Sequence, residues 1–163
     1  MLFALRCSRV VSVAGLLSLL LSFPAAGAQL SPRFPDELQP LLLALKKARF
    51  RVLLEPPPIQ GAYGATDGRR KTIWIAPISI DLGIVRQTLI HEAVHAVQSC
   101  PNGKLKPLGL EVPVSYKIDR EISGLLYRGY AHSKFEIERE AFAMQGQPDA
   151  PGFLIRALAQ RCR

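Results

Sequence analysis

The chain has 163 residues, of which 48% are hydrophobic and 21% charged, and its formal net charge is +8. This length and composition predict one globular domain with a core of its own. The basic residues are scattered and have no aromatic residues between them, which argues against a nucleic-acid-binding protein in spite of the positive charge.

Residues 1–28 have the pattern of a secretory signal peptide. Arg6 and Arg9 precede an apolar run over residues 10–23, and Ala26-Gly27-Ala28 fits the cleavage pattern, so we expect cleavage after Ala28. A membrane anchor is the alternative, but the run is shorter than the roughly 20 residues that span a bilayer. We therefore expect a periplasmic or extracellular protein without a membrane span after cleavage. Cleavage removes two of the 21 basic residues and none of the 13 acidic ones, which leaves a charge of +6.

The remaining residues 29–163 are expected to form a single α+β domain. Asp36 is a candidate cap for a helix over residues 36–48, in which leucines recur at helical spacing. Three further segments precede the central motif: a predicted strand over 49–54, a turn-rich predicted loop over 61–70, and a predicted strand over 71–78.

A helix over residues 82–98 is expected to be buried, because its residues are apolar nearly all round. Ser79 or Asp81 is its candidate cap, and Pro101 ends it. Beyond it, residues 101–116 predict an irregular crossing. Three C-terminal helices are then expected, over 117–130, over 134–145 with Ser133 as the cap, and over 152–161.

The buried helix carries the motif His91-Glu92-Ala93-Val94-His95, an instance of H-E-x-x-H. The two histidines lie one turn apart on one face, so both imidazoles can bind one metal ion. Zinc is the ion that this motif usually holds, and Glu92 would then act on the zinc-bound water as general base. Two buried histidines without a metal, in a purely structural helix, are the alternative.

A catalytic zinc site needs a third protein ligand, and the helix over 134–145 offers three glutamates. On a helical wheel Glu138 falls in the middle of the apolar stripe, whereas Glu136 and Glu140 fall on the opposite face, which is expected to be wet. A buried carboxylate needs a positive partner, so Glu138 is the predicted ligand. An ion pair between Glu138 and a basic side chain remains open, as do Glu140 or His132 as the third ligand.

The motif, followed later by Glu138-Arg139-Glu140-Ala141, resembles the gluzincin zinc metallopeptidases and also small exported bacterial proteins of unknown function. The resemblance covers about residues 84–144. It implies a zincin-like domain with a short sheet packed on the motif helix, zinc bound by His91, His95 and Glu138, and Glu92 as base. The chain departs from the pattern at Phe142, where several such families have an acid or amide that orients a histidine.

The resemblance also implies a substrate-binding strand and a donor for the transition state. In zincin folds an edge strand binds extended substrate by backbone pairing, a role expected here for Thr72 to Ile75. The candidate donors are His132, Tyr116, Tyr127 and Tyr130. The expected partner is a peptide, a protein or a peptidoglycan cross-link.

Cys100 and Cys162 are the cysteines that remain after cleavage at residue 28. In an oxidising compartment such a pair predicts a disulfide. Zinc binding by the two cysteines is the alternative, but they lack C-x-x-C spacing. A zinc-binding protein without turnover is the alternative function for the whole chain.

Overall fold

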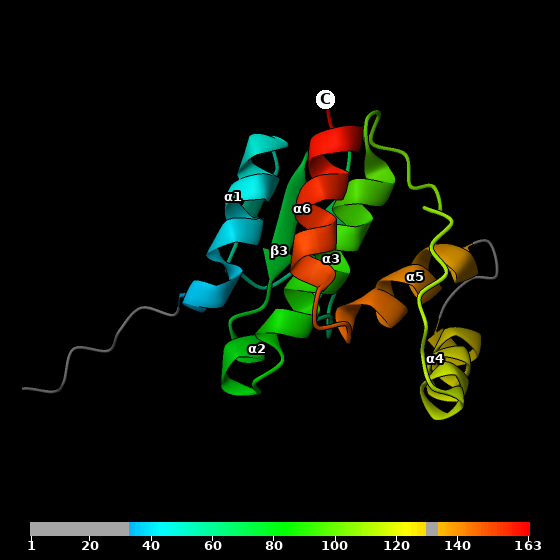
Figure 1. Cartoon of the computed structure of the whole chain (residues 1–163). Coiled ribbons are helices and arrows are strands. Elements are labelled where there is room, and N and C mark those ends of the chain that lie inside the picture. The colour runs from blue at the N-terminus through cyan, green and yellow to red at the C-terminus, as the bar shows by residue number, and fades with distance from the viewer. Residues whose placement is uncertain (1–32, 130–133) are drawn as a thin grey trace, which may run out of the picture. The chain divides into compact units, whose positions relative to one another are not determined.

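The computed structural model describes residues 33–129 and 134–163, and these residues belong to one compact unit (Figure 1). The predicted signal peptide lies outside the described residues, as do Tyr130, His132 and Ser133. The described part is an α+β structure with a three-stranded sheet. Helices come both before and after the strands in the sequence. No helix in this part is long and apolar enough to cross a membrane.

The first helix, α1 (Gln39–Lys47), follows a 3₁₀ turn over Asp36–Leu38. Leu41 and Leu45 are fully buried, as the leucine spacing predicts. The prediction that Asp36 caps the helix is wrong, because Asp36 lies inside the 3₁₀ turn. No side-chain hydrogen bond caps α1, which has a proline in its first turn.

The sheet has the order β1-β3-β2, with β1 (Arg51–Leu53) parallel and β2 (Gly64–Asp67) antiparallel to the central strand β3 (Thr72–Ile75). The loop predicted over 61–70 is therefore wrong in part, because β2 lies within it. Asp67 makes the turn to β3, since its Oδ1 accepts hydrogen bonds from the backbone N–H of Arg69 and Arg70, both at 2.9 Å. The expectation that Thr72 to Ile75 pairs with substrate is also wrong, because both edges of β3 are occupied.

The motif helix α3 (Val85–Ser99) follows a short helix α2 (Ile78–Asp81). Ser79 and Asp81 lie in α2, so neither caps α3, whose N-cap residue is Ile84. The Ser79 hydroxyl instead donates to the carbonyl of Ala76 at 2.7 Å. The helix ends at Ser99, with Cys100 as its C-cap directly before Pro101, as expected.

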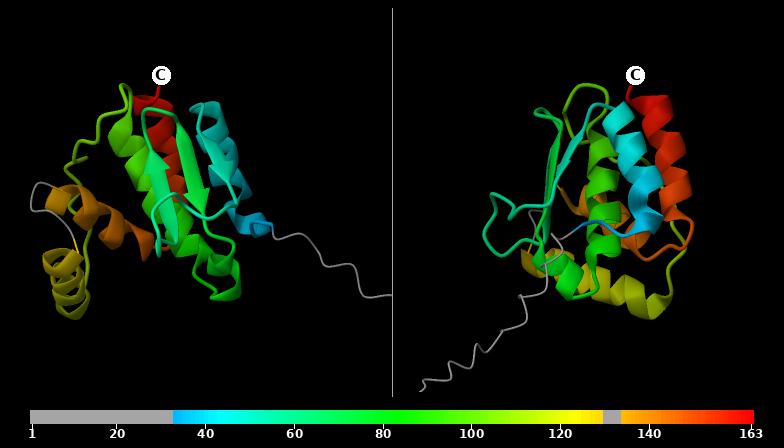
Figure 2. Two further views of the ribbon diagram at one scale, coloured as in Figure 1. Left: turned by 180° about the vertical axis from the view of Figure 1, so that it is seen from behind. Right: turned by 90° about the vertical axis from the view of Figure 1, so that its left-hand side faces the viewer.

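One face of the sheet is covered by α1 and α3, and α6 (Ala150–Arg161) packs against these two helices; the side view in Figure 2 shows all three helices on one side of the sheet. The main core lies between them and is built from Leu, Ile, Val and Ala side chains of all these elements. The predicted disulfide is confirmed: Cys100 and Cys162 are bonded and join the ends of α3 and α6.

The remaining helices, α4 (Tyr116–Gly129) and α5 (Phe135–Gln145), follow an irregular segment over 104–115. Helix α5 packs against α3, and α4 packs against α5. The α4–α5 contact forms a small second cluster around Ile122, Leu126 and Ala143. This packing brings a second helix against the motif face of α3.

Candidate metal centre

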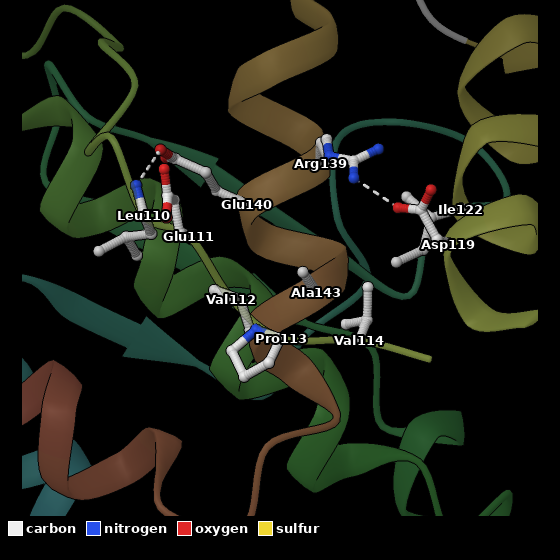
Figure 3. A pocket seen from close by; sticks show the side chains of 10 residues that line it. All are labelled: Leu110, Glu111, Val112, Pro113, Val114, Asp119, Ile122, Arg139, Glu140 and Ala143. Carbon is white, nitrogen blue, oxygen red and sulfur yellow. Dashed lines mark hydrogen bonds and ion pairs between the residues drawn. The ribbon is translucent and has the colours of Figure 1, made fainter. Parts of the chain in front are cut away.

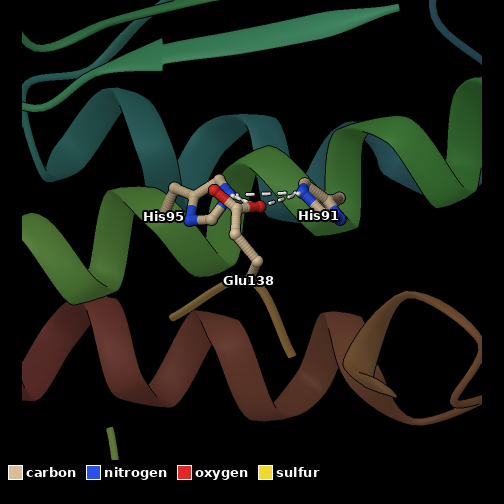
Figure 4. A group of neighbouring side chains, drawn as sticks. All are labelled: His91, His95 and Glu138. Atoms are coloured by element: carbon tan, nitrogen blue, oxygen red, sulfur yellow. Dashed lines mark hydrogen bonds and ion pairs between the residues drawn. The ribbon is translucent and has the colours of Figure 1, made fainter. Parts of the chain in front are cut away.

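The packing of α5 on α3 brings His91, His95 and Glu138 together (Figure 4). The Nε2 atoms of the two histidines are 3.2 Å apart. Glu138 Oε2 lies 3.4 Å from His91 Nε2 and 3.3 Å from His95 Nε2. Three potential ligand atoms therefore form a nearly equilateral triangle in a largely buried position.

The positions of the three side chains follow from their two helices. His91 and His95 are one turn apart, so their side chains project from the same face of α3. Glu138 lies in the first turn of α5, on the side that contacts α3, and is buried as the helical wheel predicts. Glu136, by contrast, is exposed, again as the wheel predicts.

The electrostatics of this group are those of a buried ion pair. Burial by itself would raise the pKa of Glu138, but hydrogen bonds from His91 and His95 lower it to about 2. Burial disfavours a charged His95, yet its hydrogen bond to Glu138 and the negative charge of Glu92 together raise its pKa. The site therefore favours a positive charge beside the Glu138 carboxylate.

Gln98, one turn after His95, is fully buried and links the site to α5. Its Oε1 lies 2.7 Å from His95 Nδ1. Its Nε2 donates to the carbonyl of Ile137 at 2.9 Å and to Glu140 Oε2 at 2.8 Å. Both of these partners only accept hydrogen bonds, so the amide orientation is fixed and Oε1 must accept a proton from His95 Nδ1. In the neutral form of His95, which is the form that binds a metal, the lone pair is then on Nε2, which faces Glu138.

Glu140 is held in place by three consecutive backbone N–H groups. Its carboxylate accepts hydrogen bonds from Leu108, Gly109 and Leu110 at 2.6–3.0 Å, and Figure 3 shows Leu110 facing it. Glu140 is only 7% exposed, so the prediction of a wet face is wrong. The reason is that the irregular segment over 104–115 covers this side of α5. These bonds hold Glu140 away from the ligand triangle.

His91 is supported on its other nitrogen and on its ring face. Its Nδ1 lies 3.1 Å from Gln145 Oε1, at the end of α5. The ring of Phe142 packs edge-on against the imidazole, with 4.7 Å between the ring centroids. The residue that replaces the expected acid or amide thus contacts His91 as an apolar wall, and glutamines hydrogen-bond to the two histidines instead.

Glu92 points from α3 toward the sheet edge. The Thr66 hydroxyl of β2 lies 2.8 Å from Glu92 Oε2 and 3.0 Å from the Glu92 carbonyl. Gly64 of the same strand lies so close that a Cβ there would be 2.6 Å from Glu92 Oε1. The absence of a side chain at Gly64 therefore makes room for the Glu92 carboxylate beneath β2.

A cleft of about 480 Å³ opens beside His91. It is lined by the chain before and at the start of β2, by the first half of α3 and by the end of α5, through Gly61, Ala62, Tyr63, Gly64, Ile84, Gln87, Thr88, His91, Phe142 and Gln145. The cleft gives access from the surface to the His91 side of the triangle.

A sequence profile described as Domain of unknown function (DUF8637) matches residues 80–162. The chain belongs to this family. The DUF8637 region starts in α2 and includes the whole ligand triangle, both supporting glutamines and the disulfide, whereas β1, β2 and β3 precede it. No curated protein and no solved structure matches the chain.

The residues of the DUF8637 region fit a zinc ion in number, chemistry and spacing. Ligands at about 2.0–2.1 Å from zinc with tetrahedral angles lie about 3.3–3.4 Å from one another. The triangle has edges of 3.2–3.4 Å. Two imidazole nitrogens and a carboxylate oxygen are a ligand set that catalytic zinc sites use. The group can hold a metal ion, and its role as a zinc site remains a prediction.

The predicted transition-state donors in the described part do not lie at the cleft. Tyr116 and Tyr127 are on α4 and are 77% and 71% exposed. The tyrosine that lines the cleft is Tyr63, which lies in the segment predicted to be a loop and is not among the predicted donors. Thr66 and Gln98 were also missed as site residues. Gln98 carried a usable signal, since it is a polar side chain three residues after His95 on an otherwise apolar helix.

Proposed function

We propose that this protein is an exported zinc-dependent hydrolase, most simply a small metallopeptidase. The observation that carries the proposal is the convergence of His91, His95 and Glu138 at zinc-ligand spacing, with Glu92 of the same motif held beside them by Thr66. A zincin-like fold, in which a motif helix packs under a short sheet, is part of this proposal. Export rests on the signal-peptide pattern of residues 1–28.

In this proposal each side chain has a separate task. Bound zinc would lower the pKa of a coordinated water toward 7 and polarise the substrate carbonyl. Gln98 and Gln145 hold the imidazole rings with Nε2 directed at the ligand position. Glu92 accepts the proton of the attacking water and passes it to the leaving amine. Thr66 orients Glu92 by donating a hydrogen bond to one of its carboxylate oxygens.

The free edge of β2 is the proposed place for an extended substrate. Ala76 N–H donates to the Tyr63 carbonyl at 2.8 Å, and bonded pairs alternate along an antiparallel ladder. Ala65 and Asp67 therefore also direct their backbone groups at β3. Gly64 and Thr66 direct theirs outward, where no strand of the described part pairs with them. A peptide added there would run past Glu92.

The first test is the zinc content of the purified protein without residues 1–28, beside His91→Ala and Glu138→Ala. We expect about one zinc per wild-type chain and a clear loss in both variants. A folded wild-type protein that takes up no zinc would contradict the proposal.

The second test separates an enzyme from a protein that only holds zinc. Glu92→Gln keeps the shape of the side chain but removes the base, so we expect zinc to be retained and peptide hydrolysis to fall by about 10²–10⁴-fold. Zinc binding without hydrolysis of any peptide by the wild-type protein would favour a non-catalytic zinc protein.

A further inference from the structure

The cleft beside His91 is lined almost entirely by uncharged side chains. None of its lining residues is an Asp, Glu, Lys or Arg. The polar groups at the cleft are the uncharged side chains of Gln87, Thr88, Gln145 and Tyr63. A charged side chain entering this cleft would lose water without meeting an opposite charge, which is costly.

Apolar and aromatic side chains form part of the walls of the cleft. Phe142 stands on one side with its ring packed on His91. Tyr63 and Ile84 contribute from the chain before β2 and from the N-terminal end of α3. Phe142 occupies the position at which the resembled peptidases have an acid or amide. This apolar wall is therefore a property of the present chain and does not come with the H-E-x-x-H motif.

The cleft is large enough to admit a bulky side chain. Its volume of about 480 Å³ is within the range of small-molecule pockets, and it is open to solvent at one side. Burial of apolar side-chain surface here is favourable. The cleft adjoins Gly64, whose outward backbone groups offer pairing to an extended chain.

We propose that this cleft selects substrates by binding one bulky, uncharged, apolar side chain of an extended peptide, next to the bond that is cleaved. The inference rests on the proposed function, because it assigns the substrate class of the same site. Leucine and phenylalanine side chains bind in the cleft, whereas aspartate, glutamate, lysine and arginine are rejected.

The test is direct peptide binding to the zinc-loaded Glu92→Gln protein. The probes are alanine-glycine hexapeptides in which one position at a time carries Leu, Phe, Asp or Lys. At one position we expect Leu and Phe peptides to bind at least about tenfold more tightly than Asp and Lys peptides. Phe142→Ala should reduce this preference. Gln87→Lys, at the exposed rim of the cleft, should shift it toward Asp by about tenfold, whereas Gln160→Lys, exposed on α6, should leave it unchanged.

Two outcomes would overturn the inference. One is peptide binding that is absent, or that has no side-chain preference at any position. The other is a preference that neither Phe142→Ala nor Gln87→Lys changes. Hydrolysis by the wild-type protein is measured in parallel and decides the proposed function separately. Cleavage without side-chain preference would contradict the inference about the cleft but not the proposed peptidase activity. Selective binding without cleavage would contradict the peptidase activity but not the side-chain preference of the cleft.

Discussion

The hydrogen bonds of Gln98 and Glu140 determine which nitrogen of His95 can bind a metal. Glu140 accepts only, so Gln98 must donate to it and must accept from His95 Nδ1. Neither residue is among the three ligand candidates. Such outer partners nevertheless set the orientation and the tautomer of a metal-binding histidine.

We therefore expect Glu140→Gln to weaken zinc binding by about 10–100-fold, although Glu140 is not a ligand. A glutamine at this position can donate as well as accept, so the orientation of Gln98 is no longer fixed. Glu136→Gln, on the exposed side of the same helix, is the matched control. Zinc affinity is measured by competition with a chelator. Equal affinities of the two variants would show that the chain from Glu140 to His95 does not position the metal ligand.

The pKa shifts of the ligand group predict a pH dependence of zinc affinity. The pKa of His95 is raised in the metal-free protein, so zinc competes with a proton for this imidazole up to a higher pH than it would for an unperturbed histidine. The pKa of Glu138 is lowered to about 2, so this carboxylate is already ionised. Zinc affinity should rise with pH and level off once pH exceeds the raised pKa of His95. A titration from about pH 5 to 9 checks this, and a flat profile would contradict it.

At the scale of elements, the strand β2 shows why part of the site was not predictable. Its sequence, Gly-Ala-Thr-Asp, begins with a glycine, is followed by Gly68 and has the composition of a turn. The structure shows that Gly64 and Gly68 are needed for close approach, because a Cβ on either would collide with α3 at Glu92 or Ser99. The strand forms because it pairs with β3 and packs on α3. Neither contact can be predicted from the local sequence pattern.

Contacts that a local pattern does not contain also explain why the exposure predicted for Glu140 is wrong. The burial predicted for Glu138 is confirmed. The wheel of α5 identified one apolar stripe, and Glu138 lies on it, facing α3. The opposite side of α5 carries polar residues, which predict exposure. It is covered instead by the irregular segment before α4, whose backbone N–H groups need an acceptor. A segment without periodicity gave no sequence signal that it packs there.

The contact between β2 and α3 leads to a prediction for Gly64. Gly64→Ala places a Cβ 2.6 Å from Glu92 Oε1, so the Glu92 side chain must shift. We expect hydrolysis to fall at least about tenfold while zinc content stays near one per chain, because a small displacement of a catalytic group is enough for such a loss. Gly146→Ala is the control, since a Cβ there meets nothing within 4 Å. Full activity in Gly64→Ala would argue against Glu92 as the base in this position.

For the described molecule as a whole, α3 is the shared element of three sets of contacts. Its motif face meets α5, its apolar sides meet the sheet and α6, and its C-terminal end is joined to the end of α6 by the disulfide. The DUF8637 region holds the ligand group, but Thr66 and Gly64 come from the sheet before it. The proposed catalytic centre therefore requires the sheet as well as the family region.

The disulfide is expected to stabilise this arrangement without taking part in metal binding. It joins residues that are 62 positions apart, and closing a loop of this length in the unfolded chain corresponds to about 4 kcal/mol. We expect the Cys100→Ser/Cys162→Ser protein to lose up to about this amount of unfolding free energy in urea denaturation. Its zinc content should equal that of the wild-type protein, because His91, His95 and Glu138 are unchanged. A folded double variant that no longer binds zinc would instead assign the metal to the cysteines.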